Sequence, residues 1–186
     1  MKFGVASLIC LNLISGANAA EITNLTEPSV PPTDPVIKTL KLDSMHEPAP
    51  DFEYANVDGK KHHLSELKGQ AVILHFWANW CVSCRKELPD LQRATQKWAK
   101  NSIVFLPISV EGSENKKESL SFLKENAPEL SYLIPTEAKS VHRYWAWGLP
   151  ATYLINTKGE LVARALGARN WNDVSAKEVR ALLEVR

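Results

Sequence analysis

The sequence predicts an α/β fold built on a mixed central sheet with helices on both faces. Residues 70–77, "QAVILHFW", are a near-continuous apolar run, which is typical of a parallel strand buried on both faces. Strand-like and helix-like segments alternate after this run, as in α/β proteins. The chain then closes with two strands joined by a turn and a final amphipathic helix. Together these three observations indicate one folded domain.

The individual elements follow from hydrophobic periodicity and turn residues. In chain order we expect a hairpin over 51–67 that turns at "DGK", a strand over 70–77, a helix over 82–100, a strand over 102–110, a helix over 114–126, a short strand over 131–135, a short helix over 137–147, two strands over 151–167 and a helix over 175–186. Ser175 and Glu178 have the spacing of a capping box at the last helix. Pro107 is unwelcome inside a central strand, so we expect an edge or a bulge there.

The N-terminus has the features of a secretory signal peptide over residues 1–19. Lys2 precedes a short apolar stretch, and Ala17 and Ala19 form an A-x-A cleavage site. The alternative is an uncleaved membrane anchor, although the apolar stretch is short for a span. The sequence therefore predicts an exported protein in the periplasm, membrane-anchored if the signal stays in place.

Residues 20–50 contain six prolines and predict an extended spacer, in which "VIKTLKL" (36–42) is a stray strand. The folded domain is expected over residues 51–186. The net charge of +1 gives no argument for a nucleic-acid partner. We expect a monomer.

The cysteines point to chemistry. Cys10 leaves with the signal peptide, so the exported protein keeps only Cys81 and Cys84. An even pair is expected to be bridged in an oxidising compartment. A bridge that closes so short a loop constrains the unfolded chain little, so it is a poor structural brace. A structural zinc site is a weak alternative, because it needs about four ligands and no second CxxC exists.

The predicted helix over 82–100 gives the two thiols different surroundings. Cys84 shares an inward face with large apolar groups at a 3-4 spacing. Cys81 lies at the helix N-terminus, where free N–H groups and the helix dipole favour a thiolate, and Arg85 and Lys86 add to the effect. We therefore expect Cys81 to be the exposed nucleophile and Cys84 the resolving thiol.

The segment "FWANWCVSC" resembles the active site of thioredoxin-fold oxidoreductases. Pro89 falls where that family has the proline of its active-site helix, and "GLPATYLI" (148–155) resembles the loop with a cis proline, here Leu149–Pro150. The leading hairpin, "CRKELP" and the signal peptide are similar to the exported TlpA/ResA/CcmG group. The resemblance covers residues 50–186. It implies a thioredoxin-like fold with an extra helix and strand inserted between Cys84 and Pro150.

The resemblance implies roles for several residues. Cys81 and Cys84 match the redox pair and Pro150 the cis proline, beside which the backbone at Leu149 is free to pair with substrate. Trp80 and Trp147 are candidates for substrate contact, against the alternatives of a surface aromatic for Trp80 and a core aromatic for Trp147. No metal or other cofactor is implied.

Two ionisable residues are further candidates. Glu87 matches an acidic residue of ResA-like members and would accept a proton or tune the thiols; the alternative is a solvated glutamate. His75 stands where thioredoxins have a buried aspartate. It is either a hydrogen-bonded core histidine, which we favour, or a proton relay for Cys84.

The resemblance thus implies a periplasmic thiol–disulfide oxidoreductase acting on cysteines of exported proteins. It favours a reductant, for example in cytochrome c maturation, supplied with electrons by a membrane partner of the DsbD/CcdA type. The alternative function is a copper-binding module of the Sco type, although those use CxxxC. A peroxiredoxin is not expected, because the sequence lacks a peroxidatic cysteine motif.

Overall fold

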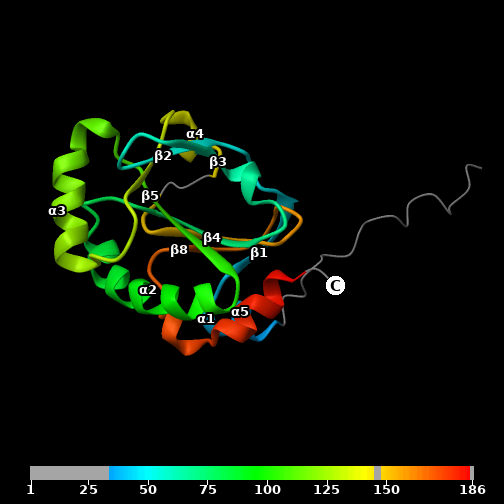
Figure 1. Cartoon of the computed structure of the whole chain (residues 1–186). Coiled ribbons are helices and arrows are strands. Elements are labelled where there is room, and N and C mark those ends of the chain that lie inside the picture. The colour runs from blue at the N-terminus through cyan, green and yellow to red at the C-terminus, as the bar shows by residue number, and fades with distance from the viewer. Residues whose placement is uncertain (1–33, 145–147, 185–186) are drawn as a thin grey trace, which may run out of the picture.

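The computed structural model describes residues 34–144 and 148–184. Their strands form one sheet in the order β1-β8-β7-β4-β5-β6-β2-β3 (Figure 1). The strands are β1 (Asp43–Pro48), β2 (Glu53–Asn56), β3 (Lys61–His63), β4 (Ala71–Trp77), β5 (Ile103–Ser109), β6 (Leu133–Pro135), β7 (Ala151–Ile155) and β8 (Glu160–Leu166). β5 is parallel to both β4 and β6, whereas the other pairs are antiparallel. The sheet is therefore mixed, as predicted, and the leading hairpin is β2–β3.

Helices cover both faces of the sheet. They are α1 (Pro35–Leu40), α2 (Val82–Lys100), α3 (Lys116–Asn126), α4 (Lys139–His142) and α5 (Ala176–Leu183), with 3-10 turns η1 (Leu64–Leu67), η2 (Ser113–Asn115) and η3 (Trp171–Asp173). In Figure 1, α1, α2 and α5 lie below the sheet and α4 above it. The capping box of Ser175 and Glu178 is present at α5, as predicted. The fold is thioredoxin-like, with α3 and β6 inserted after β5.

β4 explains why the sheet is covered on both sides. Every residue of this strand is buried. Successive side chains of a strand point to opposite faces. Ile73 and Trp77 accordingly join the core under α1, α2 and α5, while Leu74 and Phe76 join a second core with the hairpin and η1. Helix α2, which begins directly after Cys81, starts shortly after the end of this doubly buried strand.

Residues 34–50 are part of the fold, so the expected spacer is wrong over this stretch. Asp34 caps α1 by accepting a hydrogen bond of 2.8 Å from the N–H of Val36, and Pro35 occupies the first turn, where its missing N–H costs nothing. The buried residues of α1 are Val36, Ile37 and Leu40, so "VIKTLKL" begins as a helix rather than a strand. β1 then pairs with β8 at the edge of the sheet.

The expected bulge at Pro107 is wrong, because the register of β5 with β4 is continuous. Although β5 lies inside the sheet, at Pro107 it is paired with β4 only, so the expected edge holds locally. The pairing of β5 with β6 is at Ile108, directly after the proline. A residue without an N–H is tolerated at the point where a strand's second neighbour is only beginning.

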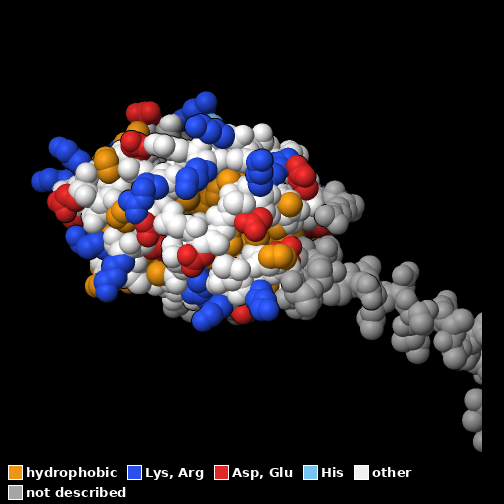
Figure 2. All heavy atoms as spheres, turned by 90° about the horizontal axis from the view of Figure 1, so that it is seen from below, with side chains coloured by type: hydrophobic (Ala, Val, Ile, Leu, Met, Phe, Trp, Pro, Cys, Tyr) orange, Lys and Arg blue, Asp and Glu red, His pale blue; other side chains and the backbone are white. Residues whose placement is uncertain are grey.

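Within the described residues, no helix has the length and apolar character needed to cross a membrane. Figure 2 shows one face of the molecule, on which Lys and Arg side chains are interspersed with Asp and Glu. The charged side chains on that face therefore do not form one large patch of a single charge sign. The predicted signal peptide over 1–19 and the first part of the spacer lie outside the described residues.

Candidate active site around Cys81 and Cys84

Cys81 and Cys84 form a disulfide at the N-terminus of α2. Cys81 is the N-cap residue of the helix, and its Sγ accepts a hydrogen bond of 3.1 Å from the backbone N–H of Cys84. The N–H of Cys81 in turn donates to the carbonyl of Ala78 at 3.2 Å. Because the first N–H groups of a helix lack partners within it, this position favours negative charge on Cys81 when the bond is reduced.

The two cysteines differ slightly in burial, and Cys84 is the more buried of the two, as expected from the sequence. Cys84 is completely buried and Cys81 is 4% exposed. The prediction that Cys81 would be the exposed thiol is nevertheless wrong for the disulfide form. The exposed groups are its neighbours Trp80 and Val82, at 66% and 70%. A reacting partner would meet these two side chains first.

The predicted cis bond is present at Leu149–Pro150, and this loop contacts the start of α2. The hydroxyl of Ser83 donates a hydrogen bond of 3.1 Å to the carbonyl oxygen of Leu149. The same hydroxyl lies 3.5 Å from the Sγ of Cys81. The carbonyl of Leu149 is therefore already bonded, whereas the resemblance implied that the backbone there is free. Sequence reasoning did not single out Ser83.

A largely apolar hollow of about 360 Å³ is lined by Trp80, the neighbour of Cys81 in the sequence, and by the loop of the cis proline. Trp80 and Leu149, both predicted to contact substrate, line it together. The other lining residues are Val110, Ala138, Val141, His142 and Gly148. Trp80 is thus a surface aromatic that also borders a candidate binding surface. The third predicted contact, Trp147, lies outside the described residues.

Glu87 is not a solvated glutamate, so that alternative is wrong. It lies one helical turn beyond Cys84 and is 3% exposed. Its Oε1 accepts hydrogen bonds from the N–H of Arg169, at 3.1 Å, and from Nε1 of Trp171, at 2.6 Å, while Oε2 has no partner among the residues that the structure describes. Burial raises the pKa of Glu87 to about 7, against the lowering effect of those hydrogen bonds. This carboxyl group can bind and release a proton near neutral pH.

His75 is fully buried on β4, as expected both for a core histidine and for a proton relay. Its Nδ1 lies 2.9 Å from the hydroxyl of Thr152 on β7, which is its register partner. Its Nε2 has no partner in the described part of the chain. Burial lowers the pKa of His75 to about 3, so the ring is neutral. A neutral ring has one donor and one acceptor nitrogen, so it can still pass a proton.

A second buried acid, Glu111, was missed by sequence reasoning. It follows β5 and is 8% exposed. Its Oε2 accepts hydrogen bonds from the N–H of Asn79, at 2.7 Å, and from the hydroxyl of Ser119 on α3, at 3.1 Å. Glu111 therefore connects the inserted helix to the loop that carries Cys81. Its position after a strand, ahead of a helix, gave no local signal of this contact.

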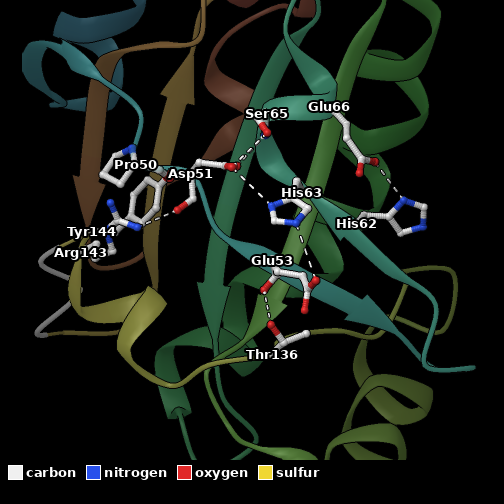
Figure 3. A network of polar contacts seen from close by, with 10 residues as sticks. All are labelled: Pro50, Asp51, Glu53, His62, His63, Ser65, Glu66, Thr136, Arg143 and Tyr144. Atoms are coloured by element: carbon white, nitrogen blue, oxygen red, sulfur yellow. Dashed lines mark hydrogen bonds and ion pairs between the residues drawn. The ribbon is translucent and has the colours of Figure 1, made fainter.

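A polar network joins the leading hairpin to the segment ahead of the cis proline (Figure 3). Asp51 accepts hydrogen bonds from the N–H and the hydroxyl of Ser65 and lies 3.4 Å from Nδ1 of His63. On the other side, Arg143 donates to the carbonyl of Asp51, and Tyr144 to that of Pro50. The hairpin thus anchors the chain just before the active-site loop.

His62 and His63 point to different acidic side chains, as expected for adjacent strand residues. His62 contacts Glu66 at 3.3 Å, whereas His63 lies between Asp51 and Glu53. Over residues 34–144 and 148–184, no three His, Cys, Asp or Glu side chains gather as a set that could hold a metal ion.

Comparisons with known proteins agree with this geometry. The thiol-disulfide oxidoreductase ResA of Bacillus subtilis is 30% identical over 119 residues, which cover 64% of this chain and 65% of ResA, just under two thirds of its length. The crystal structure of StoA from Bacillus subtilis has a TM-score of 0.57 at 25% identity, covering 72% of this chain and 96% of StoA.

A putative thiol:disulfide interchange protein DsbE from Chlorobium tepidum shares the fold. Its TM-score is 0.63 at 24% identity, and the match covers 76% of this chain and 99% of that protein. The model of the AhpC/TSA family matches residues 45–164, which include β4, the cysteine pair and the cis proline. The chain therefore belongs to the AhpC/TSA family and, within it, is similar to the thiol-disulfide oxidoreductases of the ResA, StoA and DsbE type.

Proposed function

We propose that the protein is an exported thiol–disulfide oxidoreductase that acts in the periplasm on cysteines of other exported proteins. The observation that carries the proposal is the disulfide of Cys81 and Cys84 at the start of α2, against the cis-proline loop. The names of the similar proteins support the reaction class. The location rests on the signal peptide that the sequence predicts.

In the reducing direction, the Cys81 thiolate attacks one sulfur of a substrate disulfide. This step forms a mixed disulfide and releases one substrate thiolate. Cys84 then attacks the sulfur of Cys81, restores the internal disulfide and releases the second substrate thiolate. Two electrons pass from the pair to the substrate, and Cys84 gives up its proton.

Glu87 is our candidate for the proton acceptor of Cys84. It lies one turn further along α2, and a pKa of about 7 lets it take up and release a proton at neutral pH. Among the described residues its Oε2 has no hydrogen-bond partner, so this oxygen is open to accept a proton. His75, on β4, is a second candidate for relaying the proton.

We infer that the pair acts as a reductant, as the resemblance to the TlpA/ResA/CcmG group suggests. Reduction of cysteines for cytochrome c maturation is one such task, and a membrane partner of the DsbD/CcdA type would return electrons to the pair. Measuring the equilibrium of the pair against glutathione tests the direction. A pair that is far more oxidising than glutathione would contradict a reducing role.

A trapping experiment tests the reaction itself. Cys84→Ser removes the resolving thiol, so mixed disulfides between Cys81 and exported proteins should accumulate in periplasmic extracts. Cys81→Ser is the matched control and should trap nothing, because Cys84 is fully buried. Equal trapping by both variants, or none by either, would refute the proposed mechanism.

A further inference from the structure

Ser83 lies between two acceptors at the centre of the site. Its hydroxyl donates to the carbonyl oxygen of Leu149 at 3.1 Å and is 3.5 Å from the Sγ of Cys81. A serine hydroxyl has a single proton, so it can donate to only one of these two atoms at a time. In the disulfide form the carbonyl is the better acceptor, because a bridged sulfur is neutral and accepts weakly.

Reduction changes this balance. When a partner dithiol reduces the bridge, the Cys81–Cys84 bond breaks, a disulfide forms in the partner and two electrons enter the pair. Of the two protons of the partner dithiol, one is transferred to Cys84 and the other is released to solvent, so Cys81 at the helix N-terminus is left as the thiolate. A hydrogen bond to a charged acceptor is roughly twice as strong as one between neutral groups. The thiolate therefore competes well with the carbonyl of Leu149 for the proton of Ser83.

We propose that Ser83 is a redox-dependent switch, whose hydroxyl holds the cis-proline loop in the oxidised protein and turns to the Cys81 thiolate in the reduced protein. Two donors then stabilise this thiolate, namely the Ser83 hydroxyl and the N–H of Cys84, which already donates to the same sulfur. At the same time the carbonyl of Leu149 is released. The state of the disulfide is thereby transmitted to the loop.

The released carbonyl belongs to a residue that lines the apolar hollow beside Trp80. The loop at this hollow is consequently hydrogen-bonded to α2 through Ser83 when the pair is oxidised, and this hydrogen bond is absent when the pair is reduced. The inference rests on the proposed function in one respect, namely that Cys81 is the thiol that reacts.

Cysteine titration tests the first half of the switch. In the reduced protein, the pH midpoint of Cys81 alkylation by iodoacetamide should rise by about one pH unit in Ser83→Ala, because a charge-assisted hydrogen bond to the thiolate is lost. Ser83→Thr keeps the hydroxyl and should stay close to the wild type. Ser121→Ala removes an exposed serine hydroxyl on α3 and should change nothing. An unchanged midpoint in Ser83→Ala would overturn the proposal.

The carbonyl carbon of Leu149 tests the second half of the switch, the release of this carbonyl on reduction. Its NMR chemical shift should differ between the oxidised and reduced wild type, and oxidised Ser83→Ala should resemble the reduced wild type. The same shift in both redox states of the wild type would also overturn the proposal. Neither measurement uses a substrate, so a failure to trap exported proteins would refute the proposed function without being confused with a failure of the switch.

Discussion

The carboxylate of Glu111 accepts a hydrogen bond of 2.7 Å from the backbone N–H of Asn79, two residues ahead of Cys81. Ser119 of α3 donates to the same oxygen, and the carboxylate is almost completely buried. An acid from the far end of β5 thus fixes the loop between β4 and α2. The inserted helix is coupled to the cysteine pair through this contact.

Glu111→Ala should lower the free energy of unfolding by about 1–3 kcal/mol, because it leaves the Asn79 amide without its acceptor. It should also change the rate at which reduced Cys81 is alkylated, because the loop loses its anchor. Glu111→Gln keeps an acceptor oxygen and should cost less on both measures. Urea denaturation and alkylation kinetics provide the two readings.

Leu123→Ala is the matched control for Glu111. This residue is 3% exposed on α3, so its truncation should destabilise the domain by about 2–5 kcal/mol. It should leave the alkylation of Cys81 in folded molecules unchanged. If Leu123→Ala altered alkylation as much as Glu111→Ala, the effect would be one of stability and not of loop position.

Glu87 should make stability fall as the pH rises. Its pKa is raised from 4.5 to about 7 in the folded protein, so between these values the folded state binds a proton that the unfolded chain has released. The free energy of unfolding therefore decreases across this window, by about 3 kcal/mol in total. Glu87→Gln removes this contribution while keeping an oxygen for Trp171. Urea denaturation at several pH values measures the slope; identical slopes in both proteins would show that Glu87 does not titrate in this range.

Thiol titration tests the catalytic role of Glu87. If its carboxyl group exchanges a proton with the pair, Glu87→Gln should alter the pH dependence of thiol reactivity in the reduced, folded protein. The circular dichroism spectrum should remain that of the wild type. A titration curve unchanged by the substitution would leave Glu87 a buried structural acid.

Local patterns were sufficient for most of the fold. The apolar run of β4 and the 3.6-residue spacing of α2 are periodic signals, and both elements were predicted at or near their observed bounds. The N-terminal segment was missed because its prolines were counted as a group. Pro35 starts a helix, and three apolar residues of α1 share its buried face.

The site was only partly predictable for a different reason. Glu87 was identified by its place after the cysteines, but its burial comes from Arg169 and Trp171, more than eighty positions away. The contact of Glu111 with Asn79 likewise spans 32 positions. Contacts across such separations, whether to a side chain or to the backbone, leave no periodic signal in a single sequence.

Trp80 should matter for substrate and not for stability. Its side chain is 66% exposed beside the apolar hollow, so Trp80→Ala should change the free energy of unfolding by no more than about 0.5 kcal/mol. Exchange with a protein disulfide should slow, because an apolar contact surface is lost. Exchange with a small disulfide reagent is the control and should be little affected. Equal slowing with both substrates would place the effect on the thiols themselves.

His75 should act on stability in the direction opposite to Glu87. Its pKa is lowered from 6.5 to about 3, so between these values the unfolded chain binds a proton that the folded protein lacks. The free energy of unfolding therefore rises with pH across this window, by on the order of 4–5 kcal/mol. This contribution of His75 is lost again as the pH falls through the window. From pH 4.5 to 6.5 the two slopes oppose each other. Glu87→Gln should consequently expose the rising slope of His75, whereas His75→Asn should leave the falling slope of Glu87.

The same residue decides between a core histidine and a proton relay. In both cases His75→Ala should cost stability, on the order of 1–3 kcal/mol or more at neutral pH, because it leaves a cavity and takes away the partner of the Thr152 hydroxyl. A relay predicts that disulfide exchange per folded molecule also slows, mainly at neutral pH and above, where Cys84 must give up its proton. A core histidine predicts an unchanged rate per folded molecule. Since the unpartnered Nε2 is the atom that a relay would use, His75→Asn, which can still bond Thr152 through its amide, should restore part of the stability and none of the relay. Full recovery of the exchange rate in His75→Asn would rule the relay out.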